Sequence, residues 1–462
     1  MRWDTLIRGG TVVTPSGVVP GDVGIADGLV AEIAPEITGA ARDVIDATGC
    51  HVFPGVIDPH VHFNDPGRAD WEGIATGSLA LSAGGGTLFI DMPLNASPPT
   101  LDAASFDAKF TAARGVARTD FALWGGLVPG NVERLPELAE RGVAGFKAFM
   151  SASGIDDFSA ADDATLWQGM RVAARLGLPV LVHAENDAIT TALAREAVAA
   201  GRTGVRDYLA SRPVVAELEA IARAIGLAAD TGCRLHVVHV SSAAGAVLVA
   251  EARARGVDVT CETCPHYLVL TDDDAVRLGA VAKCAPPLRP ADVQTALWTE
   301  LRAGRIEFVA SDHSPAPPSM KESASFFEVW GGISGCQTTL GLMLEEGHAV
   351  RGLPLEAIAR LTADRAARRF GLAGRGRLEE GCAADVAIVD LSVAARLAPE
   401  SLRDRHRLSP YLGRTLRGAV RRTLVRGTTV WADGAAVGPP CGTLVRPVRQ
   451  PPSVDPVPGS RP

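Results

Sequence analysis

Two patterns of apolar and polar positions divide the chain. Up to about residue 52, short apolar runs alternate with polar turns, and Asp27-Gly28 separates two such runs. An Asp-Gly pair in that setting is typical of a β-hairpin. The pattern returns after about residue 376, with a predicted strand at 385–390 and a predicted hairpin at 422–431. We therefore predict that residues 1–52 and 377–446 join into one small β domain.

Between these ends, apolar runs alternate with alanine-rich stretches of helical periodicity. The runs predicted as strands are 52–57, 87–90, 121–124, 143–149, 180–182, 235–239, 257–260 and 306–310. The predicted helices include 72–81, 163–176, 214–229 and 243–254. Eight β-then-α repeats over residues 53–376 predict an α/β fold, a TIM (β/α)8 barrel beside a small β-sandwich domain. The alternative is an open doubly wound sheet, but no Gly-x-Gly-x-x-Gly follows the first strand.

Composition narrows the class of protein. The chain has 462 residues, of which 47% are hydrophobic and 21% charged, with a net charge of −8. No basic block favours nucleic acid, and no apolar run is long enough for a membrane span or a signal peptide. Cys261 and Cys264 have CxxC spacing but lack a second pair, so we interpret them as ordinary thiols. We expect a cytoplasmic protein with a disordered tail at 447–462.

The candidate chemistry lies where predicted strands end. Metal-capable residues mark five of these strands: His60, His62, Lys147, His183, His239 and Asp312. Residues two apart on a strand share a face, so His60 and His62 project together. Each histidine alone is more often a packed core residue. Because a TIM barrel gathers its functional groups at the C-terminal ends of its strands, the whole set predicts a metal centre.

Lys147 needs its own explanation, since an ammonium among apolar residues and metal ligands is costly. Burial and a nearby metal lower a lysine pKa. The neutral amine can then add carbon dioxide and become a carbamate, an anion with two oxygens that can bridge two metal ions. The alternative is a cation that fixes a substrate oxygen.

In this order and strand setting, the six residues resemble those of the binuclear cyclic amidohydrolases, which include dihydroorotases, hydantoinases and allantoinases. The resemblance covers essentially the whole chain. It implies that His60, His62, carboxylated Lys147 and Asp312 hold one divalent metal. The same carbamate, with His183 and His239, would hold a second. Zinc is the expected metal, and cobalt, manganese or iron are alternatives.

Longer motifs narrow the resemblance. Dihydroorotases typically carry an arginine two residues after the second histidine, where this chain has Asn64, so a neutral substrate is expected. Motifs similar to those of allantoinases are Asp65–Arg68, Trp71–Gly73, Asp91–Asn95, Pro98–Thr100, Cys261–Tyr267, Ala282–Pro287, Trp330–Ile333 and Ser409–Thr415. This resemblance implies hydrolysis of (S)-allantoin to allantoate, in purine catabolism, by a homotetramer. A hydantoinase-like or dihydroorotase-like enzyme is the near alternative, and a non-catalytic scaffold the remote one.

The expected mechanism uses a water activated between the two metals. Asp312 accepts its proton and passes it to the leaving ring nitrogen. The expected substrate contacts are Arg68, Asn95 and the backbone of Cys284 and Gly332. Arg68 has a structural alternative, in which it binds loop carbonyls, and Asn95 has one as a turn residue.

Three further residues are expected beside the site without contacting the substrate. We expect Glu185 to orient a ligand histidine. His266 and His313 are expected to pack around the centre.

Overall fold

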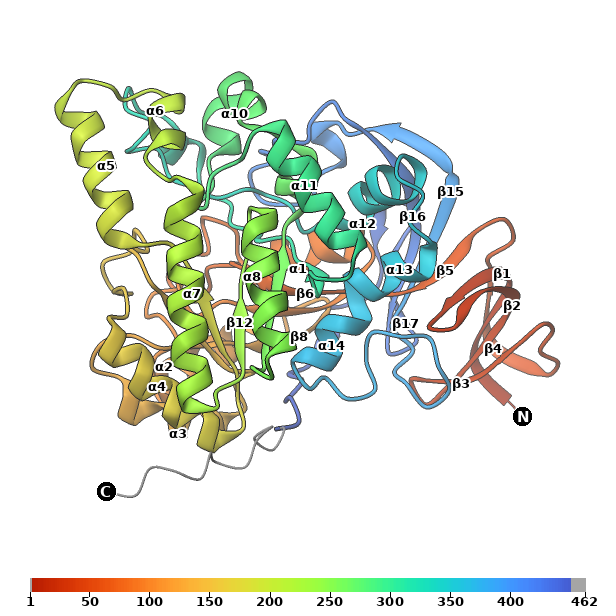
Figure 1. Cartoon of the computed structure of the whole chain (residues 1–462). Coiled ribbons are helices and arrows are strands. Elements are labelled where there is room, and N and C mark those ends of the chain that lie inside the picture. Colours follow the sequence, from red (N-terminus) through yellow and green to blue (C-terminus); the bar gives the residue numbers. More distant parts are fainter. Residues whose placement is uncertain (1, 450–462) are drawn as a thin grey trace.

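A nine-stranded sheet joins the two ends of the chain in this computed structural model, which describes residues 2–449 (Figure 1). Its strands are β1 (Arg2–Thr14), β2 (Gly17–Ala26), β3 (Leu29–Ala34), β4 (Ala40–Asp46), β5 (His51–Pro54), β15 (Val386–Arg396), β16 (Thr415–Val425), β17 (Thr428–Ala432) and β18 (Ala435–Ala436). They run in the order β18-β17-β16-β15-β5-β1-β2-β3, and β4 pairs with β1. The two halves meet where β5 pairs antiparallel with β15. The prediction that both ends build one β unit is confirmed.

Two tight turns close the predicted hairpins of this sheet. Asp27 and Gly28 join β2 to β3 with φ of 51° and 76°. Arg426 and Gly427 join β16 to β17 with φ of 47° and 74°. Positive φ at both central residues fits a turn whose twist matches that of the strands it connects.

Eight parallel repeats form the barrel from nine strands, because β8 and β9 are consecutive pieces of one repeat that are separated only by Trp124. Its strands are β6 (Val56–Val61), β7 (Gly86–Asp91), β8 (Asp120–Leu123), β9 (Gly125–Gly126), β10 (Phe146–Phe149), β11 (Val180–His183), β12 (Leu235–Val237), β13 (Val259–Thr263) and β14 (Phe308–Val309). The amide of Ala144 donates to the carbonyl of Leu123 at 2.9 Å, which joins β8 to the β10 side. The amide of His62 donates to the carbonyl of His313 at 2.7 Å, which closes the ring beside β14. The predicted TIM barrel is confirmed.

Helices cover the outside of the barrel (Figure 1). The α-helices of residues 2–449 are α1 (Ile74–Ala83), α2 (Ala103–Ala113), α3 (Leu135–Arg141), α4 (Asp163–Leu176), α5 (Asp187–Ala199), α6 (Val205–Ala210), α7 (Val214–Thr231), α8 (Ala243–Ala254), α9 (Pro265–Val269), α10 (Asp272–Leu278), α11 (Ala291–Arg302), α12 (Thr339–Leu342), α13 (Leu355–Ala359) and α14 (Arg365–Arg369). The predicted limits of α4 and α8 match the structure. The Asp162 side chain caps α4 by accepting from the amide of Thr165, and Gly177 ends it at φ 66°.

The single strand predicted at 52–57 is corrected by the structure. β5 belongs to the terminal sheet, and β6 begins the barrel two residues later. Gly55 is the crossing point, and a Cβ there would lie 2.2 Å from the Thr87 side chain. Because the run is buried on both sides of the crossing, hydrophobicity alone gives no sign of the break.

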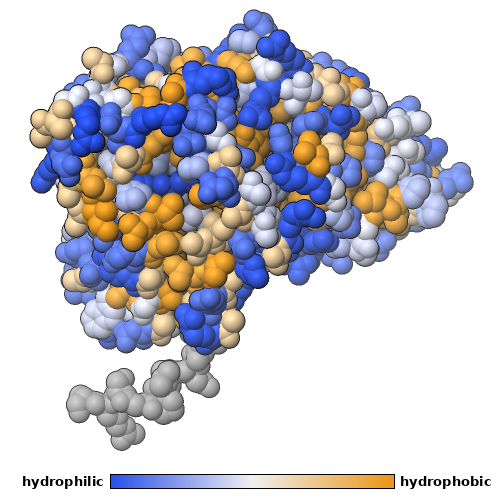
Figure 2. All heavy atoms as spheres, turned by 45° about the horizontal axis from the view of Figure 1, so that its top comes forward, coloured by the Kyte–Doolittle hydropathy of each residue, from blue (hydrophilic) through white to orange (hydrophobic). Residues whose placement is uncertain are grey.

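The C-terminal segment runs along the barrel beside β8. The Val445 amide donates to the Phe121 carbonyl at 2.7 Å, and the Val448 amide to the Gly371 carbonyl at 2.9 Å. Of the tail predicted at 447–462, residues 450–462 lie outside the described residues. No helix in residues 2–449 is long and apolar enough to cross a membrane. On the face seen in Figure 2, hydrophobic groups are scattered among hydrophilic residues.

Candidate metal centre

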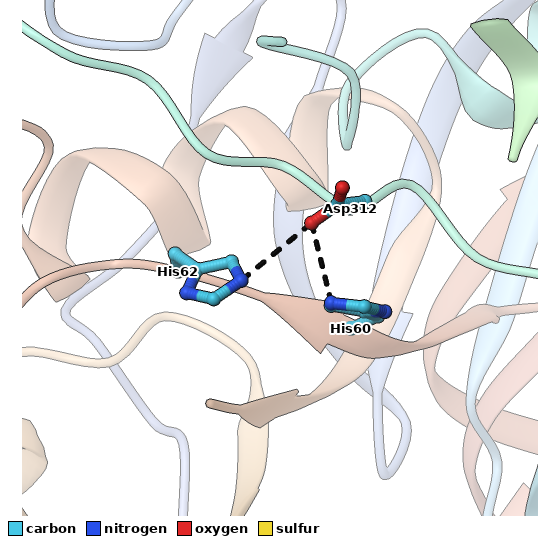
Figure 3. A group of neighbouring side chains, drawn as sticks. All are labelled: His60, His62 and Asp312. Carbon is cyan, nitrogen blue, oxygen red and sulfur yellow. Dashed lines mark ion pairs between the residues drawn. The ribbon is translucent and has the colours of Figure 1, made fainter. Parts of the chain in front are cut away.

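The first half of the centre joins the end of β6 to the segment after β14 (Figure 3). His60 Nε2 lies 3.2 Å from Asp312 Oδ1, and His62 Nε2 lies 3.5 Å from the same oxygen. One potential ligand atom from each of these three residues lies within 4.8 Å of the other two. Burial opposes the ionisation of Asp312, but the surrounding histidines outweigh burial and hold its pKa well below the usual range. These three residues form a ready site for a cation.

The second half joins the ends of β11 and β12. His183 Nδ1 faces His239 Nε2 at 3.0 Å, and the two ring centroids lie 4.7 Å apart. His239 takes a φ of 40°, which is uncommon for a non-glycine residue and turns the chain directly after the strand. The centroids of His60 and His239 are 5.5 Å apart, so the two halves are adjacent.

Lys147 lies in β10 beside both halves. Its side chain is fully buried, and Nζ has no hydrogen-bond partner among the described residues. Nζ lies 4.9 Å from the centroid of Phe149, whose ring stacks on His183. Burial lowers the pKa of Lys147 to about 7. An ammonium here would have no hydrogen-bond acceptor and no ion-pair partner among the described residues, so burial favours the neutral amine, which is the form that carbon dioxide can carboxylate.

The imidazoles are held in the neutral form that binds metal. Burial lowers the pKa of His62, His183 and His239, and for His239 the neighbouring His183 and Lys147 lower it further. A metal ligand must be deprotonated at the atom that coordinates. At neutral pH these rings therefore need no proton release before they coordinate a cation.

Two buried carboxylates set the orientation of one histidine in each half. Glu262 Oε1 contacts His60 Nδ1 at 2.5 Å, and its other oxygen contacts His236 Nε2 at 3.1 Å. Glu185 Oε2 contacts His183 Nε2 at 2.9 Å and also accepts from Arg212. Because a carboxylate accepts the N–H of the ring, Nε2 of His60 and Nδ1 of His183 are left bare. The expected role of Glu185 fits this geometry.

Sequence reasoning missed Glu262, His236 and Arg212. Glu262 belongs to the CxxC spacing and to the motif at 261–267, but neither pattern assigns it a role, and the two cysteines are buried free thiols. The signal available was Glu262 itself, which is the one charged residue in β13, a strand whose residues are all buried. A charge there needs a buried partner.

The metal centre opens into a cavity of about 400 Å³. Its wall includes four histidines, Asp312, and three of the four expected substrate contacts, namely Asn95, Cys284 and Gly332. A further part of the wall is the continuous segment 327–332. A cavity of this size suits a small cyclic molecule.

Arg68 is engaged elsewhere. Its guanidinium donates to the carbonyls of Asn95 at 2.9 Å and Ala96 at 3.3 Å, and lies over the Trp71 ring at 5.5 Å. The geometry favours the structural alternative, in which Arg68 binds loop carbonyls. Asn95 combines both interpretations, because it takes a φ of 66° in its turn and also lines the cavity, with Nδ2 3.5 Å from Ser314 Oγ.

The backbone groups expected to bind substrate already have partners within the chain. The Cys284 carbonyl accepts from the Tyr208 hydroxyl at 3.0 Å. The Gly332 amide donates to the Lys283 carbonyl at 2.7 Å, and its carbonyl accepts from Lys321 at 2.8 Å. A Cβ on Gly332 would lie 2.0 Å from the Ser314 carbonyl oxygen, so this close approach requires glycine.

The two histidines expected to pack around the site are both fully buried. His266 has no hydrogen-bond partner for either ring nitrogen among the described residues, and burial lowers its pKa to about 4. The Gly335 amide donates to His313 Nδ1 at 3.1 Å, and His313 Nε2 lies 3.7 Å from Glu72. Neither lies among the residues that line the metal cavity.

A barrel with this rim of histidines, lysine and aspartate defines a class of metal-dependent hydrolases, and the chain belongs to the amidohydrolase family, which it matches over residues 51–430. Its similarity to allantoinases extends over nearly the full length. It is 60% identical over 448 residues to the allantoinase of Rubrobacter xylanophilus, covering 97% of this chain and 98% of that protein. It is 54% identical over 447 residues to the allantoinase of Deinococcus radiodurans, covering 97% and 99%.

Solved structures agree on the fold. The L-hydantoinase (dihydropyrimidinase) of Arthrobacter aurescens superimposes with a TM-score of 0.93 at 36% identity, covering 96% of this chain and all of that one. The D-hydantoinase (dihydropyrimidinase) of a Thermus species gives a TM-score of 0.90 at 27% identity, covering 97% of this chain and all of that one. The barrel and the terminal β unit therefore keep their arrangement across these cyclic amidohydrolases.

Proposed function

We propose that this chain is an allantoinase, a metal-dependent cyclic amidohydrolase that opens the hydantoin ring of (S)-allantoin to give allantoate. The observation that carries the proposal is the 60% identity to an allantoinase over 97% of the chain, together with the convergence of His60, His62 and Asp312 in the cavity. Ring opening of allantoin would be a step of purine catabolism. We expect it to act in the cytoplasm as a homotetramer.

The donor set fits two divalent metal ions. His60, His62 and Asp312 supply one group of ligand atoms, and His183 and His239 supply another. Lys147, buried without a partner and with its pKa lowered to about 7, would complete both sites as N6-carboxylysine. Imidazole and carboxylate oxygen suit zinc, and also cobalt, manganese or iron(II). When bound, the metal ions polarise the ring carbonyl and lower the pKa of water.

Asp312 carries the proton in the proposed reaction. Its low pKa keeps it ionised at neutral pH, and its carboxylate faces the cavity beside His60 and His62. It accepts a proton from the attacking water as the water oxygen bonds to the ring carbonyl carbon. It then delivers that proton to the ring nitrogen as the C–N bond breaks, which frees the ureide nitrogen and leaves a carboxylic acid. The acid releases the second water proton to solvent at neutral pH and becomes the carboxylate.

Binding of a neutral substrate rests on the cavity wall. Asn95 offers an amide donor and acceptor. The carbonyls of Cys284 and Gly332 each accept one hydrogen bond within the chain and keep a second lone pair for a ring N–H. Because these two main-chain segments already bond within the protein, their geometry is fixed before the substrate arrives.

The decisive experiment measures metal content and ring opening on one purified sample, prepared with added zinc and bicarbonate. About two metals per chain with allantoate formed would support both the site and the substrate. Two metals with turnover of hydantoin or dihydroorotate, but not of allantoin, would keep the chemistry and favour the alternative of a different cyclic ureide. Absence of both metal and turnover would favour the scaffold interpretation.

A further inference from the structure

The chain uses lysine in an unusual way. Only four of its 45 basic residues are lysines, and the rest are arginines. Three of the four, Lys109, Lys147 and Lys283, are buried, and the fourth, Lys321, is half-buried. Arginine carries a broad planar fork, whereas lysine ends in a compact ammonium with three hydrogens. In this chain every lysine therefore lies at an enclosed position, where a compact ammonium fits better than a planar fork.

Besides Lys109, which pairs with Asp91, two of these lysines have no place in the chemistry described so far. Lys283 Nζ donates to the carbonyls of Phe326 at 2.7 Å, Phe327 at 3.2 Å and Val329. The same ammonium lies 4.6 Å from the centroid of the Tyr208 ring. Three hydrogens meet three converging carbonyls, which is a geometry that an ammonium satisfies and a guanidinium does not.

Lys321 holds the other end of the same segment. Its Nζ donates to the carbonyls of Trp330 at 2.9 Å and Gly332 at 2.8 Å. The two lysines thus bind five carbonyls within 326–332, a stretch that contains no helix or strand. Residues 327–332 of this stretch line the metal cavity.

We propose that Lys283 and Lys321 are positioning residues that clamp segment 326–332 as a wall of the metal cavity and thereby set the enzyme's selectivity among cyclic ureides. This proposal rests on the proposed function. The clamp acts through main-chain carbonyls, so it fixes the shape of the wall whatever the side chains of the segment are. A substrate with an arm on its ring contacts more of this wall than an unsubstituted ring does.

The test compares Lys283→Met and Lys321→Met with Arg206→Met as the matched control. Arg206 is an exposed cation on α6, paired with Asp273, on the same helix as Tyr208. Hydrogen exchange should be about tenfold or more faster in peptides covering 326–333 of each lysine variant, with barrel strands unchanged. The control should match the unchanged protein. Slow exchange in both lysine variants would overturn the clamp, whether or not allantoin is a substrate.

Kinetics then tests selectivity. In either lysine variant, KM for allantoin should rise about tenfold while kcat and metal content stay near their original values. The ratio of kcat/KM for allantoin to that for unsubstituted hydantoin should fall by a similar factor. Lys283→Arg should not restore this ratio of kcat/KM values, because the planar guanidinium cannot bind the three converging carbonyls. A merely structural role would lower both activities and the melting temperature together, leave the ratio unchanged, and so overturn the proposal. If Lys283→Met fails to fold, Lys321→Met decides the matter.

Discussion

The two halves of the candidate metal centre each orient one histidine through a buried carboxylate, but the charge of that carboxylate is balanced differently in each half. Glu262 holds His60 through Nδ1 and shares its second oxygen with His236, a neutral partner. Glu185 holds His183 through Nε2, and the same oxygen accepts from Arg212, a permanent cation. For both carboxylates burial opposes ionisation, and the neighbours lower the pKa to about 2. We infer that Glu262 is held in place by hydrogen bonds from two histidine rings in the His60 half. In the His183 half, the charge of Glu185 is compensated by the Arg212 guanidinium.

The largest effect should come from the residue that belongs to both halves. Lys147→Ala should abolish metal binding at both positions and lower activity by about 10³-fold or more, because the proposed bridging carbamate is lost. Metal analysis and allantoin turnover on the same sample measure this. Short-chain carboxylates should partly restore both. Full metal occupancy in this variant would contradict the carbamate.

Replacing the orienting carboxylates should separate the two halves. Glu262→Gln and Glu185→Gln should each weaken one metal by about 10- to 100-fold, because the histidine loses its fixed tautomer. Chelator titration should show one weakened and one unchanged metal per chain in each variant. The double variant should weaken both. If either single variant weakened both metals equally, the two halves would not be independent.

Removing the Arg212 guanidinium should affect only the His183 half, and the resulting loss of activity should depend on pH. In Arg212→Gln, burial of Glu185 is no longer offset, so its pKa rises from about 2. As pH falls through the new pKa, protonated Glu185 ceases to accept the His183 N–H. Activity at pH 5 should therefore drop about tenfold relative to pH 8, more than in the unchanged enzyme. A pH profile of kcat/KM measures the shift, and an unchanged acid limb would contradict it.

The smallest effect is expected outside both halves. Arg68→Met removes hydrogen bonds to two loop carbonyls and should lower the free energy of unfolding by about 1–3 kcal/mol. KM for allantoin should change little. Urea unfolding and steady-state kinetics give both quantities. A tenfold rise in KM without loss of stability would restore Arg68 as a substrate contact.

The ligand residues were predictable because they follow apolar runs that mark strand ends, and the barrel brings those ends together. The orienting groups were not, because their pairing exists only in the fold. His60 and Glu262 are 202 residues apart, and no pattern in the sequence around Glu262 indicates that it contacts His60. The crossing at Gly55 was missed for a different reason, since both segments are equally apolar and equally buried. The clamp by Lys283 depends on main-chain carbonyls, which leave no mark in the sequence.

The pairing of β5 with β15 has a consequence for synthesis on the ribosome. Pro54 pairs with Val386 in this register, so one edge of β5 stays unpaired until the ribosome has added 332 further residues. At about 5–20 residues per second, the interval is roughly 17 to 66 seconds. During it, the N-terminal strands present an open edge in the crowded cell, which favours misassociation. We expect nascent chains halted before residue 386 to be cleaved readily by protease within β1–β5, and chains halted well beyond 425 to resist.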